Sequence, residues 1–150
     1  MSNTFEANLH ILCTQPALLK SLTSLQRGIE RESLRTSPKG KLALTSHPVS
    51  LGSALTHPKI TTDYSEALLE LITPVHGSIS SCIEELDDIH HFVYEKLHKQ
   101  GEMLWASSMP CQLVKAEDIP IAQYGKSNVA KMKVAYREGL GQNSCRLAIT

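Results

Sequence analysis

Two carboxylates one residue apart, Glu30 and Glu32, are the side chains of this sequence best suited to binding a metal ion. They lie in the run RGIERESLR, residues 27–35, which is otherwise typical of a β-strand. Alternate residues of a strand project from the same face, so the two carboxylates would share one face with Cα atoms about 6.5–7 Å apart. That separation suits two ligands that flank a metal ion. The alternative is a solvated strand face with interleaved charges.

A second acidic segment, residues 61–74, carries Asp63, Glu66 and Glu70. As a strand it would place Glu66 and Glu70 on one side, whereas as a helix it would gather all three carboxylates within an arc of about 60°. The β-branched residues before its final proline favour a strand, and the alanine and leucines in its middle favour a helix. The sequence leaves both structures open, and in either one the carboxylates lie among apolar residues.

A meeting of these two segments would require cations. Two like charges about 4 Å apart repel by about 4 kcal/mol at an effective dielectric constant near 20. Three or four converging carboxylates must therefore take up protons or bind cations. Ligation by oxygen alone favours a hard divalent ion, Mg²⁺ or Mn²⁺, over zinc.

Several blocks of the sequence resemble the amino-terminal part of bacterial glutamate–cysteine ligase, also called γ-glutamylcysteine synthetase. They are GIERESLR, HPVSLGSALTHPKITTDYSEALLELITPV, LWASSMPC, AQYGKSN and YREGL, which occur in the same order as in the family. The resemblance covers about residues 12–140. It implies an α+β fold that is part of a glutamine-synthetase-like curved antiparallel sheet with covering helices.

The resemblance also implies a reaction, the ATP-dependent ligation of the γ-carboxylate of L-glutamate to L-cysteine, which is the first step of glutathione biosynthesis. ATP would phosphorylate the glutamate side chain, and the cysteine amine would then displace phosphate from the γ-glutamyl phosphate. Mg²⁺ (or Mn²⁺) would be the cofactor, because a divalent ion neutralises the charge that develops on phosphate oxygens. The expected partners are therefore L-glutamate, L-cysteine and ATP as co-substrate.

The acidic positions of the family motifs are all present. Glu30 and Glu32 match the paired metal-binding glutamates of the GxERE segment, and Asp63 and Glu70 match acidic positions of the TTDxxExxLE segment. The resemblance implies that these four residues are the metal ligands. Glu66 also falls in the second motif, but we do not include it among the predicted ligands.

Two residues near the end of the resemblance are expected in the substrate site. Arg137 is the predicted catalytic residue, because it lies where an arginine facing phosphate or substrate is expected, and a guanidinium group suits phosphate and carboxylate oxygens. Tyr136 is the predicted substrate-binding residue and would shape the cysteine pocket. The alternatives are an ordinary surface arginine and a half-buried tyrosine.

The resemblance divides the chain into two parts. Residues 1–140 would be the amino-terminal part of a ligase catalytic domain, and residues 141–150 a divergent tail where the family continues as RYG and then MQxISGxHxN. Enzymes of this family are several times longer, and a further metal ligand is expected in their later sequence. We therefore expect a truncated form that does not complete a turnover alone, with the missing carboxy-terminal part of the enzyme as its partner.

Two other functions stay open at this point. One is a catalytically incomplete fragment that acts only as a partner subunit of a split ligase. The other is a related carboxylate–amine ligase with another amine substrate, although the continuous match over TDYSEALLELITP argues against it.

The composition indicates where the protein resides and what it does not bind. Fifteen basic and fifteen acidic residues cancel, so we expect no binding to nucleic acid or to an anionic membrane. The sequence has no secretory signal at its start and no run of about eighteen apolar residues. Its four cysteines form no CxxC pair. These features predict a cytoplasmic protein with reduced thiols.

The remaining pattern predicts elements that frame the acidic segments. The clearest is a helix over residues 80–100, where apolar residues recur at intervals of three and four, and we expect it to cover the back of the sheet. Ser81 and Glu84 would form its capping box, and Gly101 would end it. We also expect short helices at 5–13 and 16–26, turns and loops at 36–58, a buried strand at 103–111 and a helix at 129–140.

Overall fold

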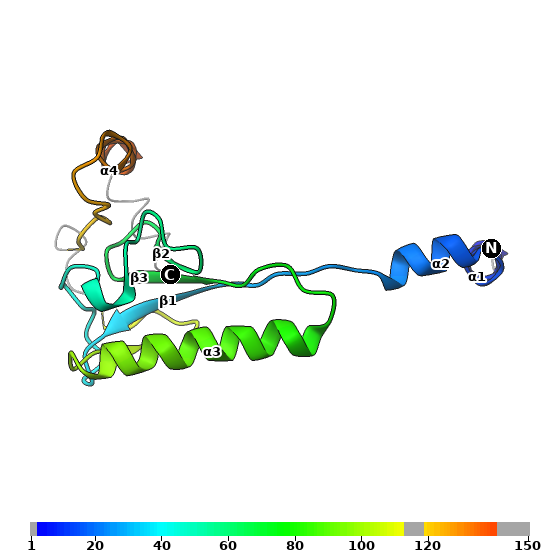
Figure 1. Cartoon of the computed structure of the whole chain (residues 1–150), viewed down its shortest axis with the longest axis horizontal. Coiled ribbons are helices and arrows are strands. Elements are labelled where there is room, and N and C mark those ends of the chain that lie inside the picture. The colour runs from blue at the N-terminus through cyan, green and yellow to red at the C-terminus, as the bar shows by residue number, and fades with distance from the viewer. Residues whose placement is uncertain (1–2, 113–118, 141–150) are drawn as a thin grey trace.

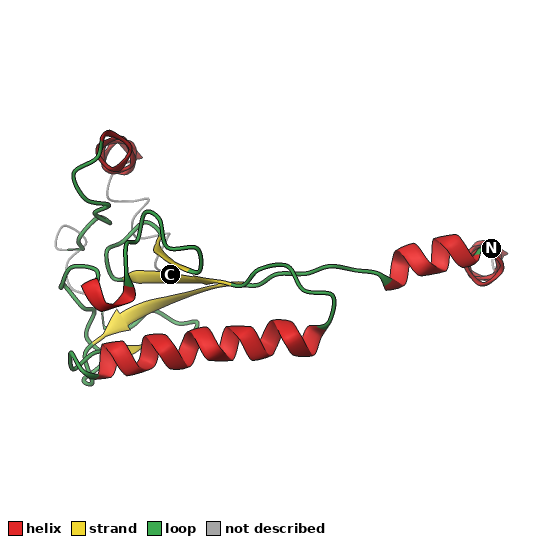
Figure 2. Ribbon diagram, in the orientation of Figure 1, coloured by secondary structure: helices red, strands yellow, loops and turns green. Residues whose placement is uncertain are grey.

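The computed structural model describes residues 3–112 and 119–140 (Figure 1). The helices are α1 (Asn3–Thr14), α2 (Pro16–Thr23), α3 (Ile79–His98) and α4 (Asn128–Leu140), with a short 3-10 helix, η1 (Val49–Leu51). The strands are β1 (Glu30–Thr36), β2 (Ile60–Thr62), β3 (Leu68–Ile72) and β4 (Met103–Leu104). Figure 2 shows how these helices and strands alternate along the chain. The predicted α+β class is confirmed, and the predicted divergent tail, residues 141–150, lies outside the described residues.

The strands form one antiparallel sheet in the order β2-β3-β1-β4. β1 lies at its centre, and its register against β3 places Glu30 opposite Ile72 and Glu32 opposite Glu70. The second acidic segment, for which the sequence left helix and strand open, contains the end of β2, a turn and then β3. Both the helix and the strand prediction treated this segment as a single element, so neither included the turn over residues 63–67.

A hydrophobic core joins the back of the sheet to α3. Leu69 and Leu71 project from β3 and pack with Ile89, Val93 and Leu97 of α3, all of them buried. Burying an aliphatic side chain of this size contributes about 1.5–3 kcal/mol relative to leaving it exposed. Figure 1 shows α3 running along this side of the sheet, so the prediction that the helix covers the back is confirmed.

The start of α3 differs from the sequence expectation. Ser78 is the residue before the first helical turn, in an extended conformation, and its side chain accepts a hydrogen bond of 3.1 Å from the backbone N–H of Ser81. The predicted capping box of Ser81 and Glu84 is therefore wrong, because Ser81 already lies inside the helix. At the other end Gly101 has a positive φ of 73° and donates its N–H to the carbonyl of His98, as a glycine stop does.

The predicted strand over residues 103–111 is also shorter than expected. Only Met103 and Leu104 belong to β4. Beyond them the chain is held by other bonds: Ser33 donates its hydroxyl to the carbonyl of Trp105 at 2.7 Å, and the indole of Trp105 donates to the carbonyl of Met109 at 2.6 Å. The backbone N–H of Trp105 still bonds the carbonyl of Leu34 at 2.8 Å, and the chain then bends into a loop over residues 106–109.

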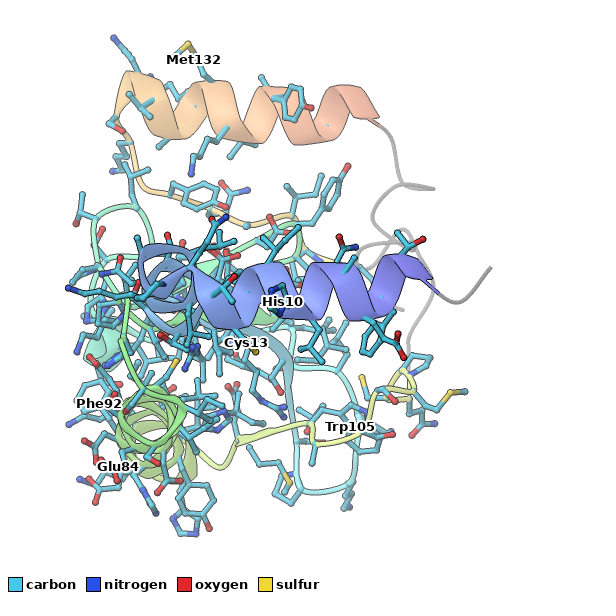
Figure 3. All side chains as sticks on the ribbon, turned by 90° about the vertical axis from the view of Figure 1, so that its right-hand side faces the viewer. His10, Cys13, Glu84, Phe92, Trp105 and Met132 are labelled. Carbon is cyan, nitrogen blue, oxygen red and sulfur yellow. The ribbon has the colours of Figure 1, made fainter. Side chains whose placement is uncertain are left out.

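The first two helices project away from the sheet. Figure 1 shows α1 and α2 at the far end of an extended segment, and Pro16 occupies the first helical position of α2 as expected. Apolar side chains on both helices are exposed, including Leu18, Leu19 and Leu22. α4 and α3 lie on opposite sides of the sheet in both Figure 1 and Figure 3, where Met132 marks α4 and Phe92 marks α3.

No helix among residues 3–112 and 119–140 is long and apolar enough to cross a membrane.

The N-cap of α3 gives a test of this fold. Ser78→Ala removes the acceptor for the Ser81 amide and should destabilise the chain by about 1 kcal/mol. The measurement is thermal unfolding followed by circular dichroism. Ser80→Ala, at an exposed position in the first turn of α3, is the matched control and should change the unfolding temperature little. An equal loss in the two variants would contradict the assigned cap.

Candidate metal-binding site

The pairing of β1 with β3 gathers carboxylates on the side of the sheet away from α3. Glu30 and Glu32 alternate along β1, and Glu70 lies directly opposite Glu32. Glu70 also pairs with Thr61 of β2, and Asp63 follows two residues later, just beyond the end of that strand. We call the four residues Glu30, Glu32, Asp63 and Glu70 the acidic face. The structure therefore places the four predicted ligands near one another on one side of the sheet.

The carboxylates of the acidic face perturb one another. Partial burial raises the pKa of Glu32, and the negative charges of Asp63 and Glu30 raise it further. Partial burial also raises the pKa of Glu70, followed by the charges of Glu30, Asp63 and Glu32. Both groups thus respond to the negative charges of Glu30 and Asp63, and a nearby cation would favour their charged form.

The donor set fits a hard divalent ion that keeps other ligands. Within the part of the chain that the structure describes, no three His, Cys, Asp or Glu side chains lie close enough together to hold one ion. Mg²⁺ commonly uses one or two carboxylates, with waters and phosphate oxygens completing its octahedron. The spread of the acidic face fits that mode of binding. The assignment of these residues as metal ligands stays a prediction.

A lysine that sequence reasoning missed also acts on this site. Lys133 of α4 lowers the pKa of Glu70 through its positive charge. Its Nζ lies 4.7 Å from the centre of the Tyr124 ring, within the range of a cation–π contact. The hydroxyl of Tyr124 lies 2.9 Å from the backbone carbonyl oxygens of Thr62 and Asp63, which accept its hydrogen bond. α4 is therefore placed beside the acidic face by contacts that no local pattern encodes.

The two predicted substrate-site residues both lie in α4. Tyr136 is 69% exposed on the surface of this helix. Residue 137 is helical, but the side chain of Arg137 lies outside the described part of the structure. Their roles in catalysis and substrate binding stay predictions.

Glu66 has a different role from the four carboxylates of the acidic face. It is only 4% exposed. One carboxylate oxygen accepts the backbone N–H of His47 at 2.8 Å, and the other accepts the N–H of Gln123 at 2.6 Å. The omission of Glu66 from the predicted ligands thus agrees with the way its carboxylate is used.

A cleft adjoins the acidic face. It has a volume of about 410 Å³ and is bounded by Glu32, Leu34 and Leu68 from the sheet and by the loop from Trp105 to Pro110. Its size is typical of a small-molecule site. A slightly larger hollow, about 490 Å³, lies at the back of the sheet between β2 and α3, away from the acidic face. We favour the cleft beside Glu32 as the substrate site because it alone of these two adjoins the acidic face.

Two solved structures that share this fold are a glutamate–cysteine ligase and a glutathione synthetase. The chain is similar to glutamate–cysteine ligase from Francisella tularensis in complex with AMP, with a TM-score of 0.72 and 45% identity over 77% of this chain and 23% of the other. It is also similar to a bifunctional glutathione synthetase from Pasteurella multocida, with a TM-score of 0.73 and 34% identity over 87% of this chain and 16% of the other.

Sequence comparison gives the particular family. Residues 10–148 match the family described as glutamate–cysteine ligase. The chain is 54% identical over 136 residues to glutamate–cysteine ligase of Alcanivorax borkumensis and 53% identical over 140 residues to that of a Janthinobacterium species. The chain belongs to the glutamate–cysteine ligase family. The two matches include 91% and 93% of this chain but only 25% and 26% of the relatives. The chain therefore spans about a quarter of their length.

The raised pKa values predict how stability changes with pH. In the folded chain Glu32 and Glu70 bind protons more tightly than in the unfolded chain. Their partial burial and the repulsion from neighbouring carboxylates therefore lower stability in full at pH values above their folded pKa, and this loss is relieved as the pH falls through that pKa.

Glu70→Gln should therefore stabilise the chain at neutral pH. We expect a gain of about 0.2–1 kcal/mol, the range for a cross-strand pair, and a smaller rise in stability on acidification than in the unmodified chain. Urea unfolding at several pH values measures both effects. Glu84→Gln, on the exposed outer side of α3, is the control and should leave the profile unchanged. A loss of stability in the Glu70 variant at neutral pH would contradict the repulsion.

Lys133 predicts a change in cation binding. Its charge opposes a divalent ion on the acidic face, so Lys133→Met should tighten the binding of Mn²⁺ by about two- to fivefold at moderate salt. Titration followed by electron paramagnetic resonance measures the free ion. Lys131→Met, at an exposed position in the same helix, removes the same charge as a control. Equal tightening in both variants would mean that Lys133 has no special position.

Proposed function

We propose that this chain supplies the metal-binding part of a glutamate–cysteine ligase, which joins the γ-carboxylate of L-glutamate to the amine of L-cysteine with ATP as co-substrate. The observation that carries the proposal is the acidic face, where partial burial and the charges of Glu30 and Asp63 raise the pKa of Glu32 and Glu70. Family membership supports the choice of reaction.

The acidic face would hold Mg²⁺ or Mn²⁺ through Glu30, Glu32, Asp63 and Glu70. When bound, such a cation neutralises negative charge on the phosphate oxygens of ATP, which favours transfer of the terminal phosphoryl group. The glutamate γ-carboxylate accepts that group, and the cysteine amine then attacks the resulting γ-glutamyl phosphate and releases phosphate.

Residues of α4 would complete the charge balance beside the phosphates. Lys133 lies near Glu70, so its positive charge is beside the acidic face. Arg137 is one helical turn further along α4, and its guanidinium group is suited to binding phosphate or carboxylate oxygens. Tyr136 is our candidate for a contact with the cysteine substrate.

The comparisons support the choice of substrates. The curated relatives named above are glutamate–cysteine ligases, which favours cysteine over another amine. The Francisella tularensis enzyme is a complex with AMP, which supports an adenine nucleotide as the phosphoryl donor. Because the chain spans about a quarter of its relatives, these substrates are proposed for the enzyme of which the acidic face is a part.

We place this function in the cytoplasm. Cys13, Cys82 and Cys111 are free thiols, and free thiols are typical of proteins in a reducing compartment.

The acidic face is tested by direct measurement of metal binding to the full 150-residue chain. Mn²⁺ should bind in a titration followed by electron paramagnetic resonance, and Glu32→Gln should weaken that binding by about tenfold or more, since even partners of metal ligands contribute about 10–100-fold. Glu84→Gln is the matched control and should bind like the unmodified chain. Equal affinity in the unmodified chain and the Glu32 variant would refute the site.

A further inference from the structure

Glu66 has hydrogen-bond partners for both its backbone and its side chain. Its N–H donates to the carbonyl of Pro120 at 2.8 Å, and its carbonyl accepts a bond of 2.9 Å from the guanidinium of Arg35. Its carboxylate oxygens accept the backbone N–H groups of His47 and Gln123. A buried carboxylate requires such partners, because an unpaired charge is costly to remove from water.

The carboxylate joins three segments that are distant in the sequence. His47 is 19 residues before Glu66, and Gln123 is 57 residues after it. The turn between β2 and β3 is thereby fastened to a loop on each side. We call this arrangement of Glu66 and the amides of His47 and Gln123 the carboxylate bridge.

A buried ion pair between Arg35 and Glu102 contacts the backbone of Glu66. The side chain of Arg35 is fully buried and forms an ion pair of 2.7 Å with Glu102. Arg35 also donates to the hydroxyl and the carbonyl of Thr45, at 2.8 and 2.7 Å. The charge of Arg35 is thus balanced by Glu102, and the carboxylate of Glu66 is directed to the two neutral backbone amides.

The bridge connects directly to the acidic face. Gln123 precedes Tyr124, whose hydroxyl bonds the carbonyl of Asp63, and the N–H of Ala122 bonds the carbonyl of Tyr64 at 3.1 Å. Tyr124 also carries the contact with Lys133. The segment around Gln123, which Glu66 holds in place, therefore fixes the backbone of Asp63. Through the contact of Tyr124 with Lys133 it also fixes the position of α4.

We propose that Glu66 is a positioning residue of the ligase: it binds no metal, and it holds Asp63 and α4 in place beside the acidic face through the amides of His47 and Gln123. The inference deepens the proposed function and depends on it only for the identity of the ion. The bridge needs two acceptor oxygens. A glutamine in its place has one acceptor oxygen, and its NH₂ group would face the second amide donor.

The decisive variant is Glu66→Gln in the full chain, measured by two independent readouts. Hydrogen exchange of backbone amides, followed by nuclear magnetic resonance, should show faster exchange at His47 or Gln123 and at residues near Tyr124, whereas α3 stays protected. Mn²⁺ binding should weaken by about tenfold, as expected for a residue that orients a metal ligand. Unchanged exchange at both bridge amides would overturn the proposal.

A matched control separates positioning from general loss of stability. Glu102→Gln removes the negative charge that balances Arg35 but leaves both amide bonds to Glu66, so it should lower the unfolding temperature without faster exchange at Gln123. Tyr124→Phe removes the hydroxyl bonds to the carbonyls of Thr62 and Asp63 and should weaken Mn²⁺ binding while the amides of the bridge stay protected. The Tyr124 variant also keeps the proposal testable if the Glu66 variant fails to fold.

The two proposals fail in different ways. If the unmodified chain binds no Mn²⁺, the metal site is refuted, whereas the exchange measurements still test the bridge. If Glu66→Gln abolishes Mn²⁺ binding with both bridge amides still protected, Glu66 is itself a ligand and the positioning role is overturned. If the Glu66 and Glu102 variants accelerate exchange at the same residues to the same extent, the role is merely structural.

Discussion

The apposition of Glu32 and Glu70 across the β1–β3 pair is the constraint on which the rest of the structure depends. Like charges opposite one another weaken a strand pair, yet this pair lies in the middle of the register. Its stability comes from the other face, where Leu69 and Leu71 pack against α3. A slip of one residue would turn the carboxylates of β1 towards that core. The hydrophobic back of the sheet thus fixes the register that gathers charge at the front.

The front of the sheet carries a second hydrophobic cluster around Leu34 and Leu68, and polar contacts there join segments distant in sequence. Glu66 and Arg35 fasten the loops through buried hydrogen bonds, and Tyr124 connects one of these loops to the end of β2. Such networks require specific geometry, because each unsatisfied buried group is costly. α4 presents Met132 and Tyr136 to solvent but buries Ala130 against Ala122 and Tyr124, so its position beside the sheet depends on the loop that precedes it. Small changes in that loop would therefore alter the site before they alter the core.

What the sequence could predict depends on how far apart along the chain the interacting residues lie. The alternation of Glu30 and Glu32 is local and identifies one face of a strand, and the periodicity of α3 is equally local. The turn after β2 was not predictable from periodicity, because it depends on partners far along the chain such as Pro120. The cap of α3 was misplaced because serines at both positions 78 and 81 satisfy the same local preference. Lys133 had no local signal, since only the placement of α4 brings it near Glu70.

Family resemblance and electrostatics are two independent arguments about the acidic residues of these motifs. Family motifs include Glu32, Glu66 and Glu70 alike, although only Glu32 and Glu70 are among the ligands that the resemblance implies. Electrostatics distinguishes them: Glu32 and Glu70 respond to the same surrounding negative charges, whereas the carboxylate of Glu66 is directed to two backbone amides. A carboxylate bound by amides at both oxygens has little to gain from a cation, while mutually repelling carboxylates gain most. The direction in which each acidic side chain points therefore divides this motif into residues that can bind the ion and a residue that holds the site together.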